Sequence, residues 1–538
     1  MTALPVIDVV SEDAALDDAH CGDIMGALGS VRAEQKPEPR WWPRLLTFLA
    51  IMGPGLIVMV GDNDAGGVTT YAQAGQAYGN ALLWTLFLLI PVLMVAQEMV
   101  ARLGVVTRVG HARLIRQRFG AFWAAFSIVD LFILNALTLM TEFIGVDLGL
   151  RYFGISPYVS VPLAAGALIA VAATGSFRRW ERSMFLFIGV SLLMFPLAAL
   201  VHPEAGPVLH GLIVPGVTGG WNSTAVLFVI AIVGTTVAPW QLFFQQSNVI
   251  DKGITIRWLR HEVTETFLGA VLTNVGGAAL LVAAAFAFHA TALAGQQSSA
   301  LGLAQGFAAH VGPLEGDLFA IILINAALIG GATVAISSSY ALADLTGARH
   351  SLHRPVRDAK AFYAVYAVMV AASAAIVLIP HVPLGLINLG VQVLAGVLLP
   401  SAMVFLLLLC NDRAVLGPWV NTMRQNIVAG VIVGVLIALS VILTVTTVFP
   451  SVPIGPLCAC VAALGLAAGG YLLVRGQPVG QAGENAGLDR NTWQMPPLRT
   501  LPQMQWSRSR RLAMLVLRVY LVVAVLAMVI KLVQLAVR

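Results

Sequence analysis

The feature that most constrains the fold is a series of separate apolar runs, each long enough to cross a lipid bilayer. A helix needs about 20 apolar residues to span the hydrocarbon core. Charged residues make up only 11% of the chain, against about 25% in soluble domains. The sequence therefore predicts an all-α polytopic membrane protein. Its twelve expected spans are 45–75, 80–101, 121–150, 157–174, 183–201, 224–247, 263–288, 318–345, 361–380, 384–410, 425–449 and 454–474.

This composition excludes several classes of protein. With 58% hydrophobic residues, the chain is neither a soluble enzyme nor a nucleic-acid binder, and we expect its surroundings to be lipid. The sequence contains no nucleotide-binding loop, zinc-hydrolase spacing or nucleophile elbow. We therefore expect no enzymatic activity, no bound cofactor and no obligatory protein partner.

The charges of the loops predict the orientation in the membrane. Loops on the side of the N-terminus carry seventeen Lys and Arg residues, whereas the opposite loops carry one, Arg151. Positive loops remain in the cytoplasm, so we expect a cytoplasmic N-terminus.

Three segments flank the predicted spans. Residues 1–40 and 475–510 are polar and lack periodicity, which predicts a disordered N-terminal tail and a cytoplasmic linker. Residues 511–538 contain a further apolar run that Arg518 and Lys531 interrupt. Both a thirteenth span and an interfacial helix are compatible with this pattern.

Local patterns within the spans predict two further contacts. Glu98 and Arg102 are four residues apart in span 2, a spacing that favours an ion pair on one helix face. In span 11, Gly430 and Gly434 form a pair of small residues that predicts close helix packing.

Two spans contain sequences that interrupt a membrane helix. Span 1 carries Gly61-Asp62-Asn63-Asp64, whose two carboxylates are costly at this depth. Span 6 carries Gly234 to Gln241, in which Pro239 removes a backbone donor and bends the helix. Freed carbonyl groups at membrane depth are tolerated where they line a protein cavity. Both breaks are therefore candidates for an ion or substrate site.

The positions of the two breaks predict the architecture. They lie five spans apart in spans of opposite direction, as in inverted-repeat transporters. We expect a core over residues 41–410, with repeats at about 45–201 and 224–410, followed by additional spans in 411–474. The substrate site should lie between the broken spans 1 and 6.

The two breaks resemble motifs of the NRAMP divalent-metal transporters. Residues 64–67 read Asp-Ala-Gly-Gly where the family has Asp-Pro-Gly-Asn, and 73–75 read Gln-Ala-Gly as in the family. Residues 238–241 read Ala-Pro-Trp-Gln where the family has Met-Pro-His-Asn. The segments 178–181, 399–400 and 411–413 also fit, so the resemblance covers spans 1–10.

The resemblance implies a fold and a set of ligands. The fold is the 5+5 inverted repeat of LeuT-like transporters, with helices 1 and 6 broken. The implied metal ligands are the carboxylate of Asp64, the backbone carbonyls of Gly61 and Thr235, and the side chain of Gln392.

Departures from the family motifs alter the expected substrate. Gly67 stands at the motif's Asn and Ala238 at its Met, and the lost sulfur is a ligand that favours transition metals. A wider oxygen-lined pocket suits Mg²⁺, which dehydrates reluctantly. The chain is thus most similar to the prokaryotic NRAMP-related magnesium transporters. We expect import of hydrated Mg²⁺, and also Mn²⁺, across a prokaryotic inner membrane.

The family's proton-transfer residues are also altered. Its sixth-span histidine pair maps onto Trp240 and Gln245, and its third-span acidic pair onto Leu139 and Glu142. We therefore expect transport without obligatory proton coupling. Gln241, at the Asn of the sixth-span motif, is a further altered position beside Gly67, Ala238 and Trp240. The polar residues Asp62, Asn63 and Glu142 are candidates for an outer shell or vestibule.

Three alternatives remain at this point. A proton-coupled Mn²⁺ and Fe²⁺ importer that lost its Met would acidify the compartment that it fills. A Na⁺-coupled symporter of a small solute would carry no divalent ion. A metal sensor would bind metal without flux.

Overall fold

The structure is a computed structural model that describes residues 23–32, 41–380, 384–449, 452–475, 490 and 493–501, with 504, 515, 519 and 522 as single residues. Within these residues, nine helical segments are long and apolar enough to cross a membrane, or ten if one bent pair counts as a single span. Two shorter apolar helices, Pro157–Ala172 and Ile454–Gly465, accompany them. The chain is an integral membrane protein.

The helices follow the order of the two predicted repeats. The first comprises α3 (Pro54–Val60), α4 (Ala65–Tyr78), α5 (Leu83–Thr107), α7 (Ala121–Tyr152), α8 (Pro157–Ala172), α9 (Phe177–Ser191) and α10 (Met194–Leu200). The second comprises α12 (Ser223–Thr236), α13 (Pro239–Asp251), α14 (Leu259–Ala287), α16 (Pro313–Thr346), α17 (Lys360–Val377) and α18 (Leu384–Cys410). After the repeats come α20 (Met423–Val448) and α21 (Ile454–Arg475).

Shorter elements connect these helices. They are β1 (Asp23–Gly26), β2 (Gly29–Arg32), α2 (Trp41–Ile51), η2 (Gly79–Leu82), α6 (His111–Phe119), α11 (Ala205–Ile213), η3 (Ile256–Trp258), α15 (Ala300–His310), α19 (Arg413–Leu416), η4 (Gly417–Trp419) and η5 (Leu498–Thr500).

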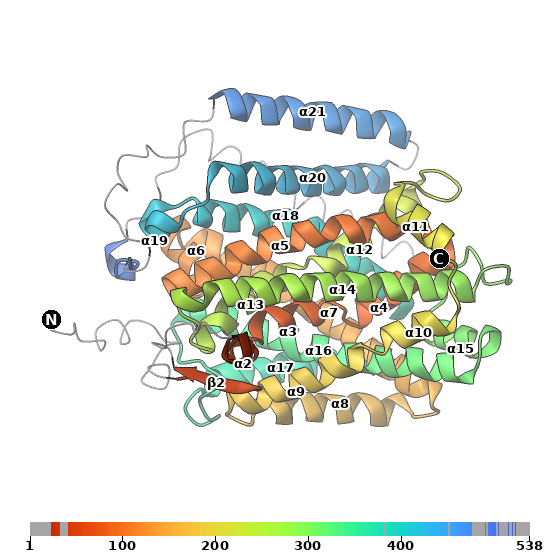
Figure 1. Cartoon of the computed structure of the whole chain (residues 1–538), viewed down its shortest axis with the longest axis horizontal. Coiled ribbons are helices and arrows are strands. Elements are labelled where there is room, and N and C mark those ends of the chain that lie inside the picture. The colour runs from red at the N-terminus through yellow and green to blue at the C-terminus, as the bar shows by residue number, and fades with distance from the viewer. Residues whose placement is uncertain are drawn as a thin grey trace.

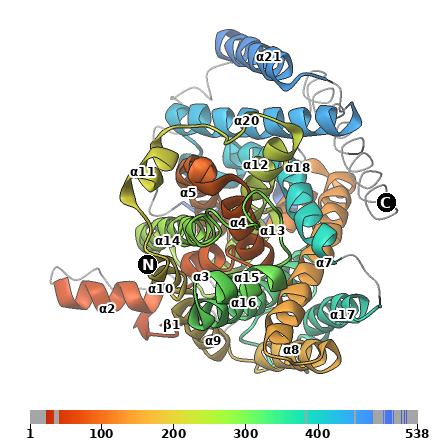
Figure 2. The same cartoon turned by 90° about the vertical axis from the view of Figure 1, so that its right-hand side faces the viewer.

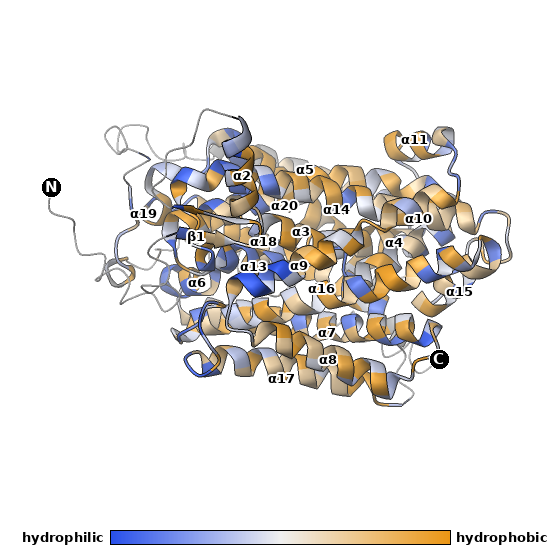
Figure 3. Ribbon diagram, turned by 60° about the horizontal axis from the view of Figure 1, so that its bottom comes forward, coloured by the Kyte–Doolittle hydropathy of each residue, from blue (hydrophilic) through white to orange (hydrophobic). Residues whose placement is uncertain are grey.

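The broken helices occupy the centre of the bundle. Seen along the helices, α4 and α13 are enclosed by their neighbours, whereas α20 and α21 lie at one side and α2 projects outward (Figure 2). Helix α4 packs against α7, α12, α14 and α16, and α12 packs against α18. The long helices run side by side along the bundle (Figure 1). Apolar residues cover much of their outer surface, while hydrophilic residues gather near β1, α6 and α13 (Figure 3).

The predicted spans agree with the helices except at two places. Residues 45–51 of the expected first span lie in the separate helix α2 (Trp41–Ile51), which is bent by 59° from α3. The helix is interrupted at Gly53-Pro54-Gly55, where glycine and proline disfavour a continuous helix. Span 5 forms one apolar helical segment, Phe177–Leu200, with a short irregularity at Leu192 and Leu193 between α9 and α10 that its sequence did not predict.

The two local packing predictions had different outcomes. Arg102 Nε lies 2.8 Å from Glu98 Oε1, which confirms the predicted ion pair. Among the described residues, nothing lies within 4 Å of a Cβ atom built on Gly430 or Gly434. Within the part of the chain that the structure describes, no helix packs closely on these two glycines, so the prediction of close packing is not confirmed there.

The N-terminal segment contains a structured hairpin. Residues 23–32 of the tail that we expected to be disordered form the antiparallel pair β1 and β2. Ile24 and Val31 bury this hairpin against apolar residues of the bundle, and this long-range packing is not visible in the local sequence. The rest of the tail, most of the 475–510 linker and most of the 511–538 run lie outside the described residues.

Candidate metal-ion site at the two broken helices

The first break is shaped by a tight turn followed by a carboxylate cap. The backbone N–H groups of Gly61, Asp62 and Asn63 bond carbonyl groups of α3, after which the chain is extended at Asp64. Asp64 Oδ1 accepts a hydrogen bond of 2.6 Å from the Gly67 N–H. Asp64 therefore caps α4, where the free N–H groups and the helix dipole favour a negative charge.

The second break arises from a proline that follows two extended residues. Helix α12 ends at Thr236, and Val237 and Ala238 have extended backbones before Pro239 opens α13. Proline is well suited to the first turn of a helix, where its missing N–H has no partner to lose. Tyr71 Oη lies 2.8 Å from Thr236 Oγ1, which links α4 to this break.

Three of the four residues predicted to supply ligands meet around Gly66 and Gly67, although Thr235 is seen there through its hydroxyl and not through the predicted carbonyl. A Cβ atom built on Gly67 would lie 2.8 Å from Thr235 Oγ1, 3.2 Å from the Asp62 carbonyl oxygen and 3.4 Å from Asp64 Oδ1. A Cβ atom on Gly66 would collide with the Gln392 side-chain amide. Asp64, Thr235 and Gln392 therefore lie together between α4, α12 and α18.

Gly61 has different neighbours. A Cβ atom built on it would lie 2.9 Å from the Ile57 carbonyl oxygen and 3.1 Å from Thr333 Oγ1 of α16. These contacts place the first residue of the turn against α16, and its ligand role stays a prediction.

Two further acids border the same break. Glu142 Oε2 of α7 accepts a hydrogen bond of 3.1 Å from the Ala65 N–H. A Cβ atom built on Gly330 of α16 would lie 2.8 Å from both Asp64 Cβ and Glu142 Oε2. Glu142 therefore lies beside Asp64 and contacts the start of α4 directly.

Asp62 is held by two buried amides. Gln241 Nε2 of α13 donates to Asp62 Oδ1, and Gln97 Nε2 of α5 donates to Gln241 Oε1 at 3.1 Å. Gln97 was not among the site residues predicted from the sequence, although an amide within an apolar span is a usable signal. Asp62 thus belongs to the site between the breaks and is oriented by α5 and α13.

Several oxygen atoms at the site are buried without a partner. Among the described residues, no hydrogen-bond donor or acceptor reaches Asp62 Oδ2, Glu142 Oε1 or Thr235 Oγ1. Buried polar atoms usually have partners, so these oxygens are suited to an ion or its water molecules. No cluster of three or more His, Cys, Asp or Glu side chains in the described parts of the chain could hold a resident metal ion.

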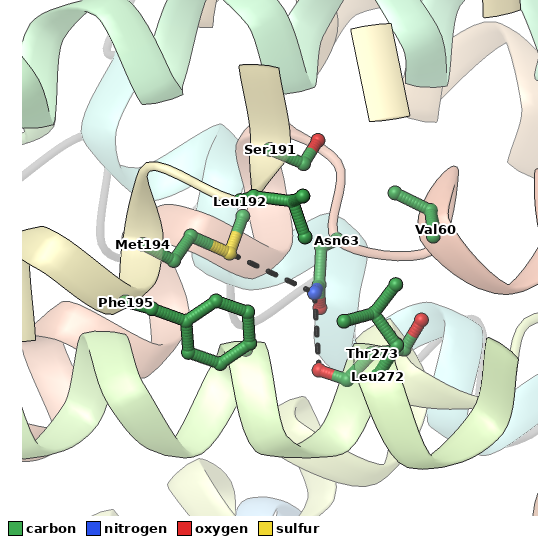
Figure 4. Close-up of a pocket in the computed structure, with 9 residues that line it drawn as sticks. Val60, Asn63, Ser191, Leu192, Met194, Phe195, Leu272 and Thr273 are labelled. Carbon is green, nitrogen blue, oxygen red and sulfur yellow. Dashed lines mark hydrogen bonds between the residues drawn. The ribbon is translucent and has the colours of Figure 1, made fainter. Parts of the chain in front are cut away.

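Asn63 points away from this group of oxygens. Its Nδ2 donates to the Thr273 carbonyl oxygen at 3.0 Å and lies 3.9 Å from Met194 Sδ (Figure 4). It lines a small pocket beside Leu192 and Met194, where α9 joins α10. The structure therefore separates Asn63 from Asp64, Thr235 and Gln392.

The altered motif positions are closely packed in this conformation. Thr235 Oγ1 lies only 2.8 Å from the position that a Cβ atom of residue 67 would take, so the absence of a side chain at Gly67 leaves little free space. Ala238 and Trp240 are buried, and the Trp240 carbonyl oxygen accepts a hydrogen bond of 2.9 Å from Ser337 Oγ. The predicted widening of the pocket at Gly67 and Ala238 thus stays a prediction.

Comparisons with known proteins support this reading of the fold and family. Residues 55–446 match the family Nramp, described as natural resistance-associated macrophage protein-like. The chain is 28% identical over 453 residues to the divalent metal cation transporter MntH of Burkholderia ambifaria, covering 80% of this chain and 95% of that protein. It is 31% identical over 270 residues to MntH of Chromohalobacter salexigens, covering 46% of this chain and 59% of that protein.

Solved structures show the same fold. The manganese transporter of Eremococcus coleocola, in complex with an aromatic bis-isothiourea substituted compound, superposes with a TM-score of 0.61 at 20% identity. That match covers 82% of this chain and 95% of the other. MhsT in complex with L-phenylalanine superposes with a TM-score of 0.50 at 13% identity, covering 73% and 98%. With its matched segment spanning both broken helices, the chain belongs to the Nramp family.

Proposed function

We propose that this protein is a secondary transporter that imports divalent cations, Mg²⁺ and also Mn²⁺, as largely hydrated ions. The observation that carries the proposal is the group of buried oxygens around Gly67, contributed by Asp62, Asp64 and Thr235. Oxygen ligands suit hard cations such as Mg²⁺. Relatives described as divalent metal cation transporters support the transport of a metal ion.

Glycine at position 67 leaves the oxygens of the site without a side chain between them. Thr235 Oγ1, the Asp62 carbonyl oxygen and Asp64 Oδ1 lie 2.8, 3.2 and 3.4 Å from the position that a Cβ atom at residue 67 would take. A larger residue would therefore press on Thr235 Oγ1 and crowd this group of oxygens. Because Mg²⁺ usually keeps several of its water molecules, we propose that these oxygens bind the ion through its waters.

Asp62 supplies a second negative charge for the ion. Its Oδ1 is fixed by Gln241 and its Oδ2 is buried without a partner in the described structure. Two carboxylates, Asp62 and Asp64, balance the charge of a divalent cation. We therefore include Asp62, with Gln392 and the carbonyl oxygens of Gly61 and Thr235, in the proposed site.

The second broken helix lacks the histidines that the family uses to move protons, so the proposed transport is not coupled to proton flow. Trp240 and Gln245 occupy the family's histidine positions, and Gln245 Nε2 instead bonds Thr266 Oγ1 at 3.0 Å. A membrane potential of 100 mV contributes about 2.3 kcal/mol per charge, or about 4.6 kcal/mol for a divalent ion. Import into the cytoplasm of a prokaryote therefore needs no accompanying proton.

The test is ion uptake into proteoliposomes that contain a Mg²⁺ dye and a pH dye. We expect Mg²⁺ influx without acidification. Asp64→Asn keeps the shape of the side chain but removes its charge, and it should lower the uptake rate at least about tenfold. Asp147→Asn is the matched control, because Asp147 pairs with Arg151 on α7, 2.5 Å away. An absence of Mg²⁺ influx in the unmodified protein would refute the proposal.

The same assay separates the alternatives. Mn²⁺ uptake that excess Mg²⁺ barely inhibits, together with acidification, would indicate a proton-coupled Mn²⁺ and Fe²⁺ importer. Uptake of no divalent ion would leave the Na⁺-coupled symporter, and metal binding without flux would leave a sensor. Ala238→Met adds a sulfur at the site and should shift the preference from Mg²⁺ toward Mn²⁺.

A further inference from the structure

The N-terminal hairpin is docked on the end of the bundle where the first broken helix begins. Strands β1 and β2 pair Ile24 with Val31, which are 2% and 5% exposed. Both residues pack in one apolar cluster with Ile51, Val249 and Trp258, from α2, α13 and η3. The alternate residues of the hairpin, Met25 and Ser30, form the next pair and are exposed.

A buried ion pair joins the turn of the hairpin to three helices. Lys252 Nζ lies 2.6 Å from Glu181 Oε1, and both side chains are fully buried. Glu181 Oε2 accepts a hydrogen bond from the Ala27 N–H in the hairpin turn. Arg182 Nε donates to the Ala27 carbonyl oxygen at 3.3 Å. The hairpin thus completes the polar surroundings of a charge pair that has no contact with solvent.

The same ion pair holds the junction between α2 and α3. Lys252 Nζ donates to the carbonyl oxygens of Ile51 at 2.6 Å and Met52 at 2.9 Å. Glu265 of α14 accepts hydrogen bonds from the N–H groups of Gly53, at 2.5 Å, and Gly55, at 3.1 Å. The first turn of α3 is therefore attached to α14 directly, and to α9 and the hairpin through Lys252.

We propose that the hairpin of residues 23–32 is a latch that holds α3 closed against the bundle and must detach before the ion site opens to this side. The inference rests on the proposed function, because an alternating-access transporter must move the half-helix that leads to its site. Helix α3 is only seven residues long, Pro54–Val60, and it leads directly to Gly61 and Asp64. Any outward tilt of α3 would separate Gly53 from Glu265 and the Met52 carbonyl oxygen from Lys252.

The contacts of the hairpin are few enough for it to detach and dock again. Its apolar contact is small and comes from two side chains, Ile24 and Val31. Its polar contact is made at the backbone of Ala27, so Glu181 and Lys252 remain paired with each other when the hairpin leaves. Water can then reach the ion pair without leaving either charge isolated.

The test measures access to α3 and needs no ion transport. A single reporter cysteine at Ile57, which is fully buried in α3, is introduced after Cys21, Cys410, Cys458 and Cys460 are replaced by Ser. Ile24→Asp with Val31→Asp disrupts the docked face of the hairpin. Met25→Asp with Ser30→Asp adds the same charges to its exposed face and is the matched control.

We expect a water-soluble maleimide to label the reporter about tenfold faster in the docked-face variant than in the unmodified chain. The control variant should react at the unmodified rate. Equal rates in all three proteins would overturn the proposal. Labelling that follows the latch while no divalent ion is transported would retain the latch and reject the proposed function.

A deletion of residues 23–32 provides a second variant that adds no charges to a buried surface. It should label at least as fast as the docked-face variant. If neither protein folds, as judged by gel filtration and thermal unfolding, the hairpin is a permanent part of the bundle and the latch proposal is wrong.

Discussion

Asp64 combines two tasks that a single carboxylate can perform at a helix terminus. It caps α4 through the Gly67 N–H and lies among the oxygens of the site. The family resemblance implied Asp64, the Thr235 carbonyl and Gln392, and the structure brings the Asp64 carboxylate and the Gln392 amide together with the hydroxyl of Thr235. The direction of Asn63 could not be predicted, because side chains in a non-helical turn do not follow the helix period. Its amide turns toward Thr273 instead.

A second residue-scale feature, His350, makes stability depend on pH. His350 lies outside the spans, and its Nε2 is 3.0 Å from Asp344 Oδ1 while its Nδ1 is 2.7 Å from the Ala348 carbonyl oxygen. Burial alone would lower the pKa of His350, but the charge of Asp344 and these two hydrogen bonds raise it overall. Both ring nitrogens face acceptors, so the protonated form fits this site.

Because the pKa of His350 is raised in the folded state, its stabilising effect is full below the ordinary histidine pKa. The effect is lost as pH rises through the higher pKa of the folded protein. We expect His350→Gln to lower the thermal unfolding temperature more at pH 6 than at pH 8. His289→Gln, at an exposed position, is the control and should show no such difference. An equal loss for His350→Gln at both pH values would contradict the role of the imidazolium.

At the scale of elements, the breaks of spans 1 and 6 were predicted from glycine and proline, whereas the bend at Gly53-Pro54-Gly55 was not, although it contains both residue types. Gly61 and Pro239 mark the breaks of spans 1 and 6 because glycine weakens a helix and proline removes a donor. The irregularity between α9 and α10 occurs at Ser191-Leu192-Leu193-Met194, which contains neither residue. The docking of the hairpin on the bundle also depends on residues that are distant in the sequence.

Close packing of α12 on α18 provides a prediction at this scale. A Cβ atom on Gly234 would collide with the Gln392 carbonyl oxygen and the Gly396 N–H group. Gly234→Ala should therefore separate the two helices, lower the free energy of unfolding by about 1–3 kcal/mol and reduce ion uptake by displacing Gln392. The effect on unfolding is measured by thermal denaturation in detergent, and uptake in proteoliposomes.

Gly430→Ala in α20 is the matched control for Gly234→Ala. In the described structure nothing lies within 4 Å of its Cβ position. Alanine is a better helix former than glycine by up to about 1 kcal/mol, so this variant should be neutral or slightly stabilised. If both variants unfold alike, the contact between α12 and α18 does not control the position of Gln392.

At the scale of the whole molecule, the positively charged loops and the hairpin latch lie at the same end of the bundle. Hydrophilic residues gather near β1, α6 and α13 (Figure 3), and the loops on this side carry most of the positive charge. The order of the apolar helices in the repeats followed from hydropathy alone, because lipid requires helices with satisfied backbones. The site between them required the motif, since hydropathy does not specify which polar atoms meet.

This asymmetry predicts a cytoplasmic location for the end that carries the hairpin. In a chain without its natural cysteines, Ala173→Cys lies in the exposed loop before α9, and Gln297→Cys lies in the exposed loop before α15. A membrane-impermeant maleimide applied to intact cells should label Cys at 297 and leave Cys at 173 unlabelled until the cells are opened. The reverse pattern would place the hairpin outside the cell. It would also mean that the latch controls entry of the ion and not its release, because α3 would then open the site to the external solution.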